Sequence, residues 1–379
     1  MDHETLSAPF ERAQALTLGI EEELMLLDAE TLELAPRAPE LLRALDGDPR
    51  FKLELPAAQI ELLTPPVATA REATRRLVAA RRDLAVAAAR LGMLVAGAGA
   101  HPFAPPLGAL NGGGRYDATR AEYGIVAAAQ LVFGLHVHVA VGGADATIAV
   151  HDALRARLPE LAALAAAAPY YGGRDTGLAS VRPQIAALLP RQGVPPALCS
   201  LETFAAELQW SAAAGVPDSR HWWWELRPHP VYGTLEIRVC DAQPEARDSG
   251  ALAGVVHALV ADLAERHAAG ALGQPVPSWR IAENRWSACR HGLAGQMADP
   301  HTGARMATAE RVGLLLDDLR GAARRVDCEA ALEDARAILA AGGEAARQRE
   351  IGAERGARGL TAWLAERFVA AGAPAIQGA

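Results

Sequence analysis

Lysine is nearly absent from this sequence. Lys52 is the only lysine among 379 residues, so arginine supplies almost all of the positive charge. A GxxxxGK[ST] phosphate loop is therefore impossible, which excludes the P-loop nucleotide hydrolases. A Schiff-base lysine is also not expected. Any phosphate chemistry in this chain must depend on arginine and bound metal.

Other signals are missing as well. The four cysteines show no CxxC or zinc-type spacing and are expected to be reduced structural thiols. The apolar stretches are too short or are interrupted by arginine, and the N-terminus has no signal-peptide pattern, so we expect a cytoplasmic protein with no membrane partner. A net charge of −8 argues against a nucleic-acid partner. No GxGxxG follows a predicted strand, which disfavours a Rossmann-type site.

The periodicity of apolar residues predicts an α+β fold. Alternation predicts strands at Leu16–Asp28, Gln59–Leu63, Met93–Ala100, Gly134–Val141, Trp222–Arg227 and Thr234–Asp241. Helical patterns cover residues 68–92, 119–130, 144–168, 201–210, 249–268, 279–297, 307–326, 329–341 and 345–371. The segments 105–115 and 170–180 are expected to be loops. We expect one domain over residues 1–379, comprising an N-terminal arm (1–15), a sheet-bearing part (16–245) and a mostly helical part (246–379).

The first predicted helix, Ala68–Gly92, is rich in arginine. Its pattern puts its arginines on the solvent side of the helix: Arg71, Arg75, Arg76, Arg81 and Arg82.

Several predicted strands carry charged residues on the face opposite their apolar side. Glu21 and Glu23 share one face of the first strand, and His136 and His138 share one face of a later strand. Two carboxylates about 6–7 Å apart repel each other unless a cation lies between them, and magnesium prefers carboxylate oxygen. A solvated edge strand and satisfied core histidines are the alternative interpretation of these residues.

Further charged residues follow the same pattern. Glu61 faces opposite Ile60 and Leu62, and Glu54 precedes it at the other end of an apolar segment. Glu236 and Arg238 share a face of the last predicted strand, where they form either an ordinary ion pair or a metal ligand beside a phosphate-binding guanidinium. Arg227 would be a second anion contact. A metal-lined sheet accounts for all of these residues together.

The order of these motifs resembles that of a known family. Gly19-Ile20-Glu21-Glu22-Glu23, Gly134-Leu135-His136-Val137-His138 and Gly233-Thr234-Leu235-Glu236-Ile237-Arg238 occur in the expected order, with Gln59–Pro66, His101-Pro102-Phe103, Gly173–Gly177, Arg227-Pro228 and Glu283–Trp286 between and after them. The chain resembles the bacterial carboxylate–amine ligases, the type-two glutamate–cysteine ligases, which are relatives of glutamine synthetase. The resemblance runs from about Gly19 into the C-terminal helices. Phe133, Glu225 and the glycine-rich loop before Arg115 depart from the family pattern.

This resemblance implies a curved, mainly antiparallel catalytic sheet with helices packed outside it, which binds ATP and Mg²⁺ or Mn²⁺. Metal ligands are implied at Glu21, Glu23, Glu54, Glu61, His136 and Glu236. Arg238 is implied at the γ-phosphate, Arg227 at the acid substrate or phosphate, and His138 at the nucleotide or substrate. The resemblance also implies that the mouth of the site is lined by Asn284, Arg285, Arg115 and Arg174. A homodimer is a further expectation from the family.

The leading hypothesis is an ATP-dependent ligase that joins a small carboxylate to a small amine through an acyl phosphate, with the γ-carboxylate of glutamate and cysteine as plausible substrates. One alternative is a ligase of the same fold that acts on a peptide or protein carboxylate. A second alternative is a protein that binds ATP and metal without turnover.

Overall fold

The computed structural model describes residues 3–216 and 219–370. The strands are β1 (Leu18–Asp28), β2 (Phe51–Leu53), β3 (Gln59–Leu63), β4 (Met93–Ala96), β5 (Gly134–Val139), β6 (Tyr170–Tyr171), β7 (Arg174–Asp175), β8 (Leu226–His229), β9 (Thr234–Asp241), β10 (Gln296–Ala298) and β11 (Arg305–Ala307). The helices are α1 (His3–Arg12), α2 (Ala38–Ala44), α3 (Ala70–Ala89), α4 (Gly114–Tyr123), α5 (Ile125–Ala128), α6 (Ala144–Leu154), α7 (Leu158–Ala165), α8 (Arg182–Ala186), α9 (Leu201–Ala213), α10 (Ala246–Ala268), α11 (Ser278–His291), α12 (Thr308–Asp318), α13 (Arg320–Arg325), α14 (Glu329–Ala340) and α15 (Glu344–Ala370). The fold is α+β, as the sequence predicts.

A seven-stranded antiparallel sheet forms the centre of the molecule. Its strand order is β2-β3-β1-β5-β9-β8, and β4 pairs with the far end of β1. The long strand β1 contacts three neighbours because β5 pairs with its first half and β4 with its second half. The sheet therefore brings together segments that lie more than two hundred residues apart.

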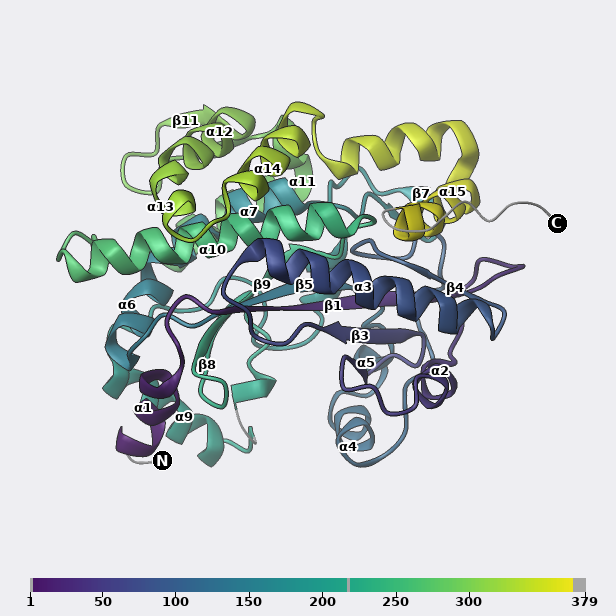
Figure 1. The fold of residues 1–379 in the computed structure, drawn as a ribbon, viewed down its shortest axis with the longest axis horizontal. Coiled ribbons are helices and arrows are strands. Elements are labelled where there is room, and N and C mark those ends of the chain that lie inside the picture. Colours follow the sequence, from purple (N-terminus) through teal and green to yellow (C-terminus); the bar gives the residue numbers. More distant parts are fainter. Residues whose placement is uncertain (1–2, 217–218, 371–379) are drawn as a thin grey trace.

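Helices cover one face of this sheet. In Figure 1, α3 and α10 run across the sheet, and α12, α13 and α14 form a further layer over α10. Val137, Ile237 and Leu24 lie fully buried under these helices and belong to the main hydrophobic cluster, which extends from Leu18 in β1 to Phe368 in α15. The apolar side of each strand thus faces these helices. On the opposite side of β1, Glu21 and Glu23 are polar, whereas Met25 and Leu27 pack against α15 in a second hydrophobic cluster. No helix in the described ranges is long and apolar enough to cross a bilayer.

The N-terminal segment contains helix α1, whose Leu6 and Phe10 are buried in a small hydrophobic cluster. One sequence expectation about this architecture is wrong. Arg81 does not lie on the solvent side of α3: it is 2% exposed and forms an ion pair with Glu22, which is also buried. On a helix, position 81 shares a stripe with Leu77 and Leu84, so its place belongs to the core face.

The remaining differences concern short elements. The strand expected at Trp222–Arg227 lies instead at Leu226–His229 (β8). The sequence pattern missed β2 and the β10–β11 hairpin, and it placed one helix across residues 279–297, where α11 ends at His291. Gly292, with φ of +56°, ends that helix, since this left-handed conformation favours glycine. The expected loop at 170–180 contains the two-residue strands β6 and β7.

Candidate active site

The charged residues predicted from strand alternation lie on one face of the sheet. The strand register pairs Glu21 with His136, Glu23 with Glu61, and Glu236 with both His138 and Arg227. Directly opposite residues of antiparallel strands have neighbouring side chains on the same face. Five strands therefore place carboxylates, imidazoles and guanidinium groups side by side.

These residues form two successive levels along the strands. Glu23, His136 and Arg238 make one level on β1, β5 and β9, and all three line a cavity. Two residues further along the same strands, Glu21, His138 and Glu236 make the next level. Glu21 is offset toward the first level, because the register pairs it with His136 and not with His138. Two residues of a strand span about 7 Å, so the two levels are distinct but adjacent.

The level formed by Glu21, His138 and Glu236 has the composition of a metal site. One ligand atom from each residue lies within 4.8 Å of the other two. The Nε2 atom of His138 lies 3.4 Å from a Glu21 oxygen and is buried without a hydrogen-bond partner among the described residues, while its Nδ1 contacts the Thr234 hydroxyl at 3.0 Å. A buried imidazole nitrogen and two carboxylates suit Mg²⁺ or, because of the nitrogen, Mn²⁺.

His136 occupies the neighbouring level. Its Nδ1 lies 3.5 Å from a Glu21 oxygen and 3.3 Å from an Arg238 nitrogen. Its Nε2 lies 3.9 Å from a Glu23 oxygen and has no hydrogen-bond partner in the part of the chain that the structure describes. The implied roles were metal ligand for His136 and nucleotide or substrate contact for His138. The geometry puts His138 in the three-residue group, and the role of His136 as a ligand stays a prediction.

The ionisation of the carboxylates also suits a bound cation. Burial raises the pKa of Glu54 to about 7, and repulsion by Glu23 adds to the shift. Burial and repulsion by Glu54, Glu21 and Glu23 raise the pKa of Glu61 well above its usual range, although Lys52 lies opposite on β2. Burial alone would raise the pKa of Glu21, but the neighbouring imidazoles of His136 and His138 outweigh this effect and lower the pKa. A divalent cation would relieve the remaining repulsion.

Glu236 is held between two arginines. Arg227 donates from Nε to one Glu236 oxygen at 2.5 Å and from a terminal nitrogen to the other at 3.1 Å, and Arg238 forms an ion pair with the same carboxylate. Burial would raise the pKa of Glu236, but these two guanidinium groups hold it well below the usual value. The other terminal nitrogen of Arg227 donates to backbone carbonyls of residues 219, 220 and 222. Arg227 is thus engaged with Glu236 and the chain, whereas Arg238 also faces the cavity.

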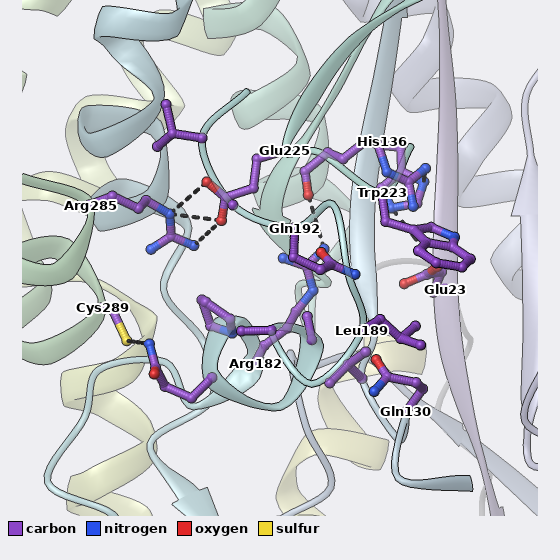
Figure 2. A pocket seen from close by; sticks show the side chains of 18 of the residues that line it. Glu23, Gln130, His136, Arg182, Leu189, Gln192, Trp223, Glu225, Arg285 and Cys289 are labelled. Carbon is purple, nitrogen blue, oxygen red and sulfur yellow. Dashed lines mark hydrogen bonds and ion pairs between the residues drawn. The ribbon is translucent and has the colours of Figure 1, made fainter. Parts of the chain in front are cut away.

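The cavity has a volume of about 310 Å³. Figure 2 shows Glu23, His136 and Trp223 on one side and the Arg285–Glu225 pair with Cys289 on the other, with Arg182 between them. Arg285 contacts both oxygens of Glu225 at 2.9 Å. Within residues 3–216 and 219–370, the Nε of Arg182 and the Oε1 of Gln59 are buried without hydrogen-bond partners, so these two cavity-lining side chains offer an unused donor and an unused acceptor. Polar atoms left in this state are sites for a polar ligand or water.

The other residues implied at the mouth lie in different places. The Asn284 side chain donates to the Ala298 carbonyl and accepts from its amide, so it holds β10 in place. Arg174 is exposed on β7 and does not line the cavity. Arg115 is exposed, stacks on Tyr116 and lies 3.7 Å from a Glu54 oxygen. Roles for these three residues stay predictions.

Sequence reasoning missed several residues that line the cavity. Arg182 begins the short helix α8, and its terminal nitrogen donates to the Arg238 carbonyl at 2.9 Å. Gln59 lies two residues before Glu61 on the same face of β3, so alternation would have found it. The run of three tryptophans at 222–224 does predict packing or a pocket wall, and Trp223 lines the cavity. It lies in an irregular segment, where no periodicity indicates which of the three side chains faces inward.

Comparisons with known proteins identify the family. A model of glutamate–cysteine ligase family 2 (GCS2) matches residues 17–359. A protein of Rubrobacter xylanophilus provisionally named glutamate–cysteine ligase 2-3 is 38% identical over 360 residues, covering 92% of this chain and 96% of the relative. A Frankia casuarinae protein provisionally named glutamate–cysteine ligase 2-1 is 34% identical over 363 residues, covering 93% and 94% of the two chains.

Two solved structures share the fold. The glutamate–cysteine ligase of Francisella tularensis in complex with AMP matches with a TM-score of 0.66 at 13% identity, covering 95% of this chain and 90% of that chain. A bifunctional glutathione synthetase from Pasteurella multocida matches with a TM-score of 0.67 at 15% identity, covering 97% of this chain and 53% of that chain. At these identities the likeness concerns the fold alone. The match of the family model over most of the sequence, together with the two relatives, shows that this chain belongs to glutamate–cysteine ligase family 2.

Proposed function

We propose that this protein is an ATP-dependent carboxylate–amine ligase. ATP phosphorylates a substrate carboxylate, and an amine then attacks the acyl phosphate, so an amide forms and phosphate leaves. The γ-carboxylate of glutamate and the amine of cysteine or a similar compound are the proposed substrates, in line with the names of the relatives. The observation that carries this proposal is the Glu21–His138–Glu236 group beside Arg238 at the edge of a cavity.

The chain's own residues would hold the reactants in place. Glu21, His138 and Glu236 would bind Mg²⁺ or Mn²⁺, with Glu23, Glu54, Glu61 and His136 as further candidate ligands. When bound, the metal neutralises charge on the phosphate oxygens. Arg238 would orient the transferred phosphoryl group, since its guanidinium faces the cavity and is fixed by Glu236. Arg227 would act through Glu236 as a positioning residue.

The cavity favours small substrates over a peptide or protein carboxylate. Its volume of about 310 Å³ lies at the small end of the usual range of ligand pockets. Trp223, Trp286 and Leu189 contribute apolar wall, which limits the water that reaches an acyl phosphate.

The test is ADP release from the purified protein. It is incubated with ATP, Mg²⁺ and pairs of acids and amines, with glutamate and cysteine among them. We expect amine-dependent ADP, its loss with EDTA, and a fall of at least about 100-fold in Arg238→Ala, because a preorganised charge on the phosphoryl group is removed. Arg247→Ala is the matched control: Arg247 forms an exposed ion pair with Asp334 and should leave the rate unchanged.

Folded protein without amine-dependent ADP for any pair would contradict the proposal. ATP that raises the melting temperature without any ADP release would favour the alternative in which the protein binds nucleotide without turnover.

A further inference from the structure

An aromatic cluster forms a third level along the polar face of the sheet. On β9, Arg238 belongs to the cavity level and Glu236 to the candidate metal level, and Thr234 follows two residues further. His229 pairs with Thr234 in the register of β8 and β9. The His229 ring stacks on that of Tyr232, with centroids 4.3 Å apart and planes at 10°. The Glu21–His138–Glu236 group therefore lies between the cavity on one side and these rings on the other.

The candidate metal group contacts the aromatic cluster directly. His138 meets the rings of His229 and Tyr232 edge-on, with centroid distances of 5.6 and 5.7 Å. Its Nδ1 lies 3.0 Å from the Thr234 hydroxyl. A ligand whose anionic part is held by a cation at Glu21, His138 and Glu236 can therefore extend in the direction opposite to the cavity and reach Tyr232.

Tyr232 is exposed but held in a fixed position. Tyr232 is 53% exposed, although the His229 ring covers one face of its ring. The Tyr232 amide donates to Nδ1 of His229, and the Gly233 amide donates to the His229 carbonyl. Gly233 has φ of +68°, and a Cβ at this position would overlap the carbonyl oxygen of Pro9 in α1. Helix α1 thus packs against this turn, and the ring is presented without a large loss of conformational freedom on binding.

We propose that Tyr232, supported by His229, is the surface on which the purine base of ATP stacks. The triphosphate then passes over Glu21, His138 and Glu236 toward Arg238, with the acid substrate in the cavity beyond. Every purine presents a flat π-face, and a fixed aromatic ring with one open face is the complementary surface. This inference rests on the proposed function, because it assigns the base end of the same nucleotide.

The test compares two ligands that differ in the base. Titration calorimetry with Mg²⁺ present measures Kd for ATP and for inorganic triphosphate, which has no base, on the wild type, Tyr232→Ala, Tyr232→Phe and Val231→Ala. Loss of one stacked base weakens binding by about 5-fold to 100-fold. We expect a shift in this range for ATP in Tyr232→Ala, no change for triphosphate, and near-normal ATP binding in Tyr232→Phe. Val231→Ala is the matched control, since Val231 is 69% exposed on the same turn.

The outcomes separate this inference from the proposed function. Unchanged ATP affinity in Tyr232→Ala would overturn the stacking role. An equal loss of ATP and triphosphate would overturn it as well, since Tyr232 would then act on the phosphate end. Triphosphate binding by Tyr232→Ala shows that the rest of the site is intact. A wild-type protein that binds neither ligand contradicts the proposed function itself.

Discussion

Three consecutive glutamates in β1 have different roles because of the side to which each points. Glu21 and Glu23 face the polar side of the sheet, and Glu22 points into the core, where it is fully buried. Arg81 donates to both oxygens of Glu22 at 2.8 and 2.5 Å, and the Ser249 hydroxyl donates to it at 2.5 Å. This buried network ties β1 to α3 and α10, so it sets the position of the strand that carries Glu21 and Glu23.

Removing Arg81 should destabilise the protein strongly. Arg81→Met leaves the Glu22 carboxylate buried without its partner, and breaking a buried ion pair in this way costs about 3–5 kcal/mol of unfolding free energy. Arg76→Ala is the matched control on the same helix, because the Arg76–Glu72 pair is exposed and contributes below about 1 kcal/mol. Urea unfolding followed by circular dichroism measures both. A loss in Arg81→Met no larger than in Arg76→Ala would show that this pair does not hold the strand.

Arg81 also shows where single-residue prediction from the sequence fails. A periodic pattern treats every arginine as solvent-facing, yet position 81 lies on the same stripe as Leu77 and Leu84. Only the partner, Glu22, makes its burial possible, and that partner lies 59 residues away. The alternation of β1 did predict that Glu22 faces opposite Glu21 and Glu23. It did not predict which helix residue meets Glu22.

At the scale of elements, strand alternation predicted the polar face of the sheet well. It is a local signal of period two, and β1, β3, β5 and β9 are long enough to show it. The three-residue β2 and the five-residue helix α8, which begins with Arg182, are too short to show a period, and Trp223 lies in an irregular segment. These residues enter the cavity only because the chain folds back over the sheet, so no local pattern could indicate them.

The start of β5 has no space for a side chain. A Cβ on Gly134 would lie 2.5 Å from an Arg182 nitrogen, 2.9 Å from Nε2 of His136 and 3.1 Å from a Glu23 oxygen. The Gly134 amide also donates to Glu23 at 2.5 Å. Its backbone is extended and unstrained, so the requirement for glycine here comes from the approach of these three charged or polar groups.

Gly134→Ala should therefore impair the site more than the fold. The methyl group would displace Arg182 and His136, and a misplacement near 1 Å costs about 100-fold in rate. We expect a large loss of ADP release with a small change in melting temperature. Gly321→Ala in α13 is the control, because a Cβ there meets only the flexible Arg325 side chain at 3.6 Å. Full activity in Gly134→Ala would mean that the site tolerates this displacement.

At the scale of the whole molecule, the buried carboxyl groups of the candidate site lower the stability of the fold when they are ionised. Burial raises the pKa of Glu54 to about 7, from 4.5 in an exposed carboxyl, so the folded protein binds this proton more tightly than the unfolded chain. The stability from this proton is present below pH 4.5 and is lost as the pH rises through 7. A shift of this size corresponds to a loss of about 3 kcal/mol. In metal-free protein, Glu54→Gln should remove this loss of stability. The melting temperature of the variant should therefore increase relative to that of the wild type as the pH rises from 5.5 to 8.

Mg²⁺ should reverse the loss in the wild type. A carboxylate must be deprotonated to bind metal, so metal binding becomes stronger as the pH rises. Relative to NaCl of equal ionic strength, we expect 10 mM MgCl₂ to raise the melting temperature more at pH 8 than at pH 5.5. This difference between the two pH values should be much smaller in Glu54→Gln. Differential scanning fluorimetry measures all of these values.

Glu344 offers a control that separates metal binding from burial alone. Burial raises the pKa of Glu344 to about 8, but this carboxyl lies in α15, where its partner is Gln348, and it does not line the cavity. Glu344→Gln should change the pH dependence of stability and leave the effect of Mg²⁺ intact. Mg²⁺ could instead raise the melting temperature equally at both pH values, or equally in the wild type and Glu54→Gln. Either result would show that repulsion between the carboxylates of Glu54 and Glu61 does not favour cation binding at this sheet.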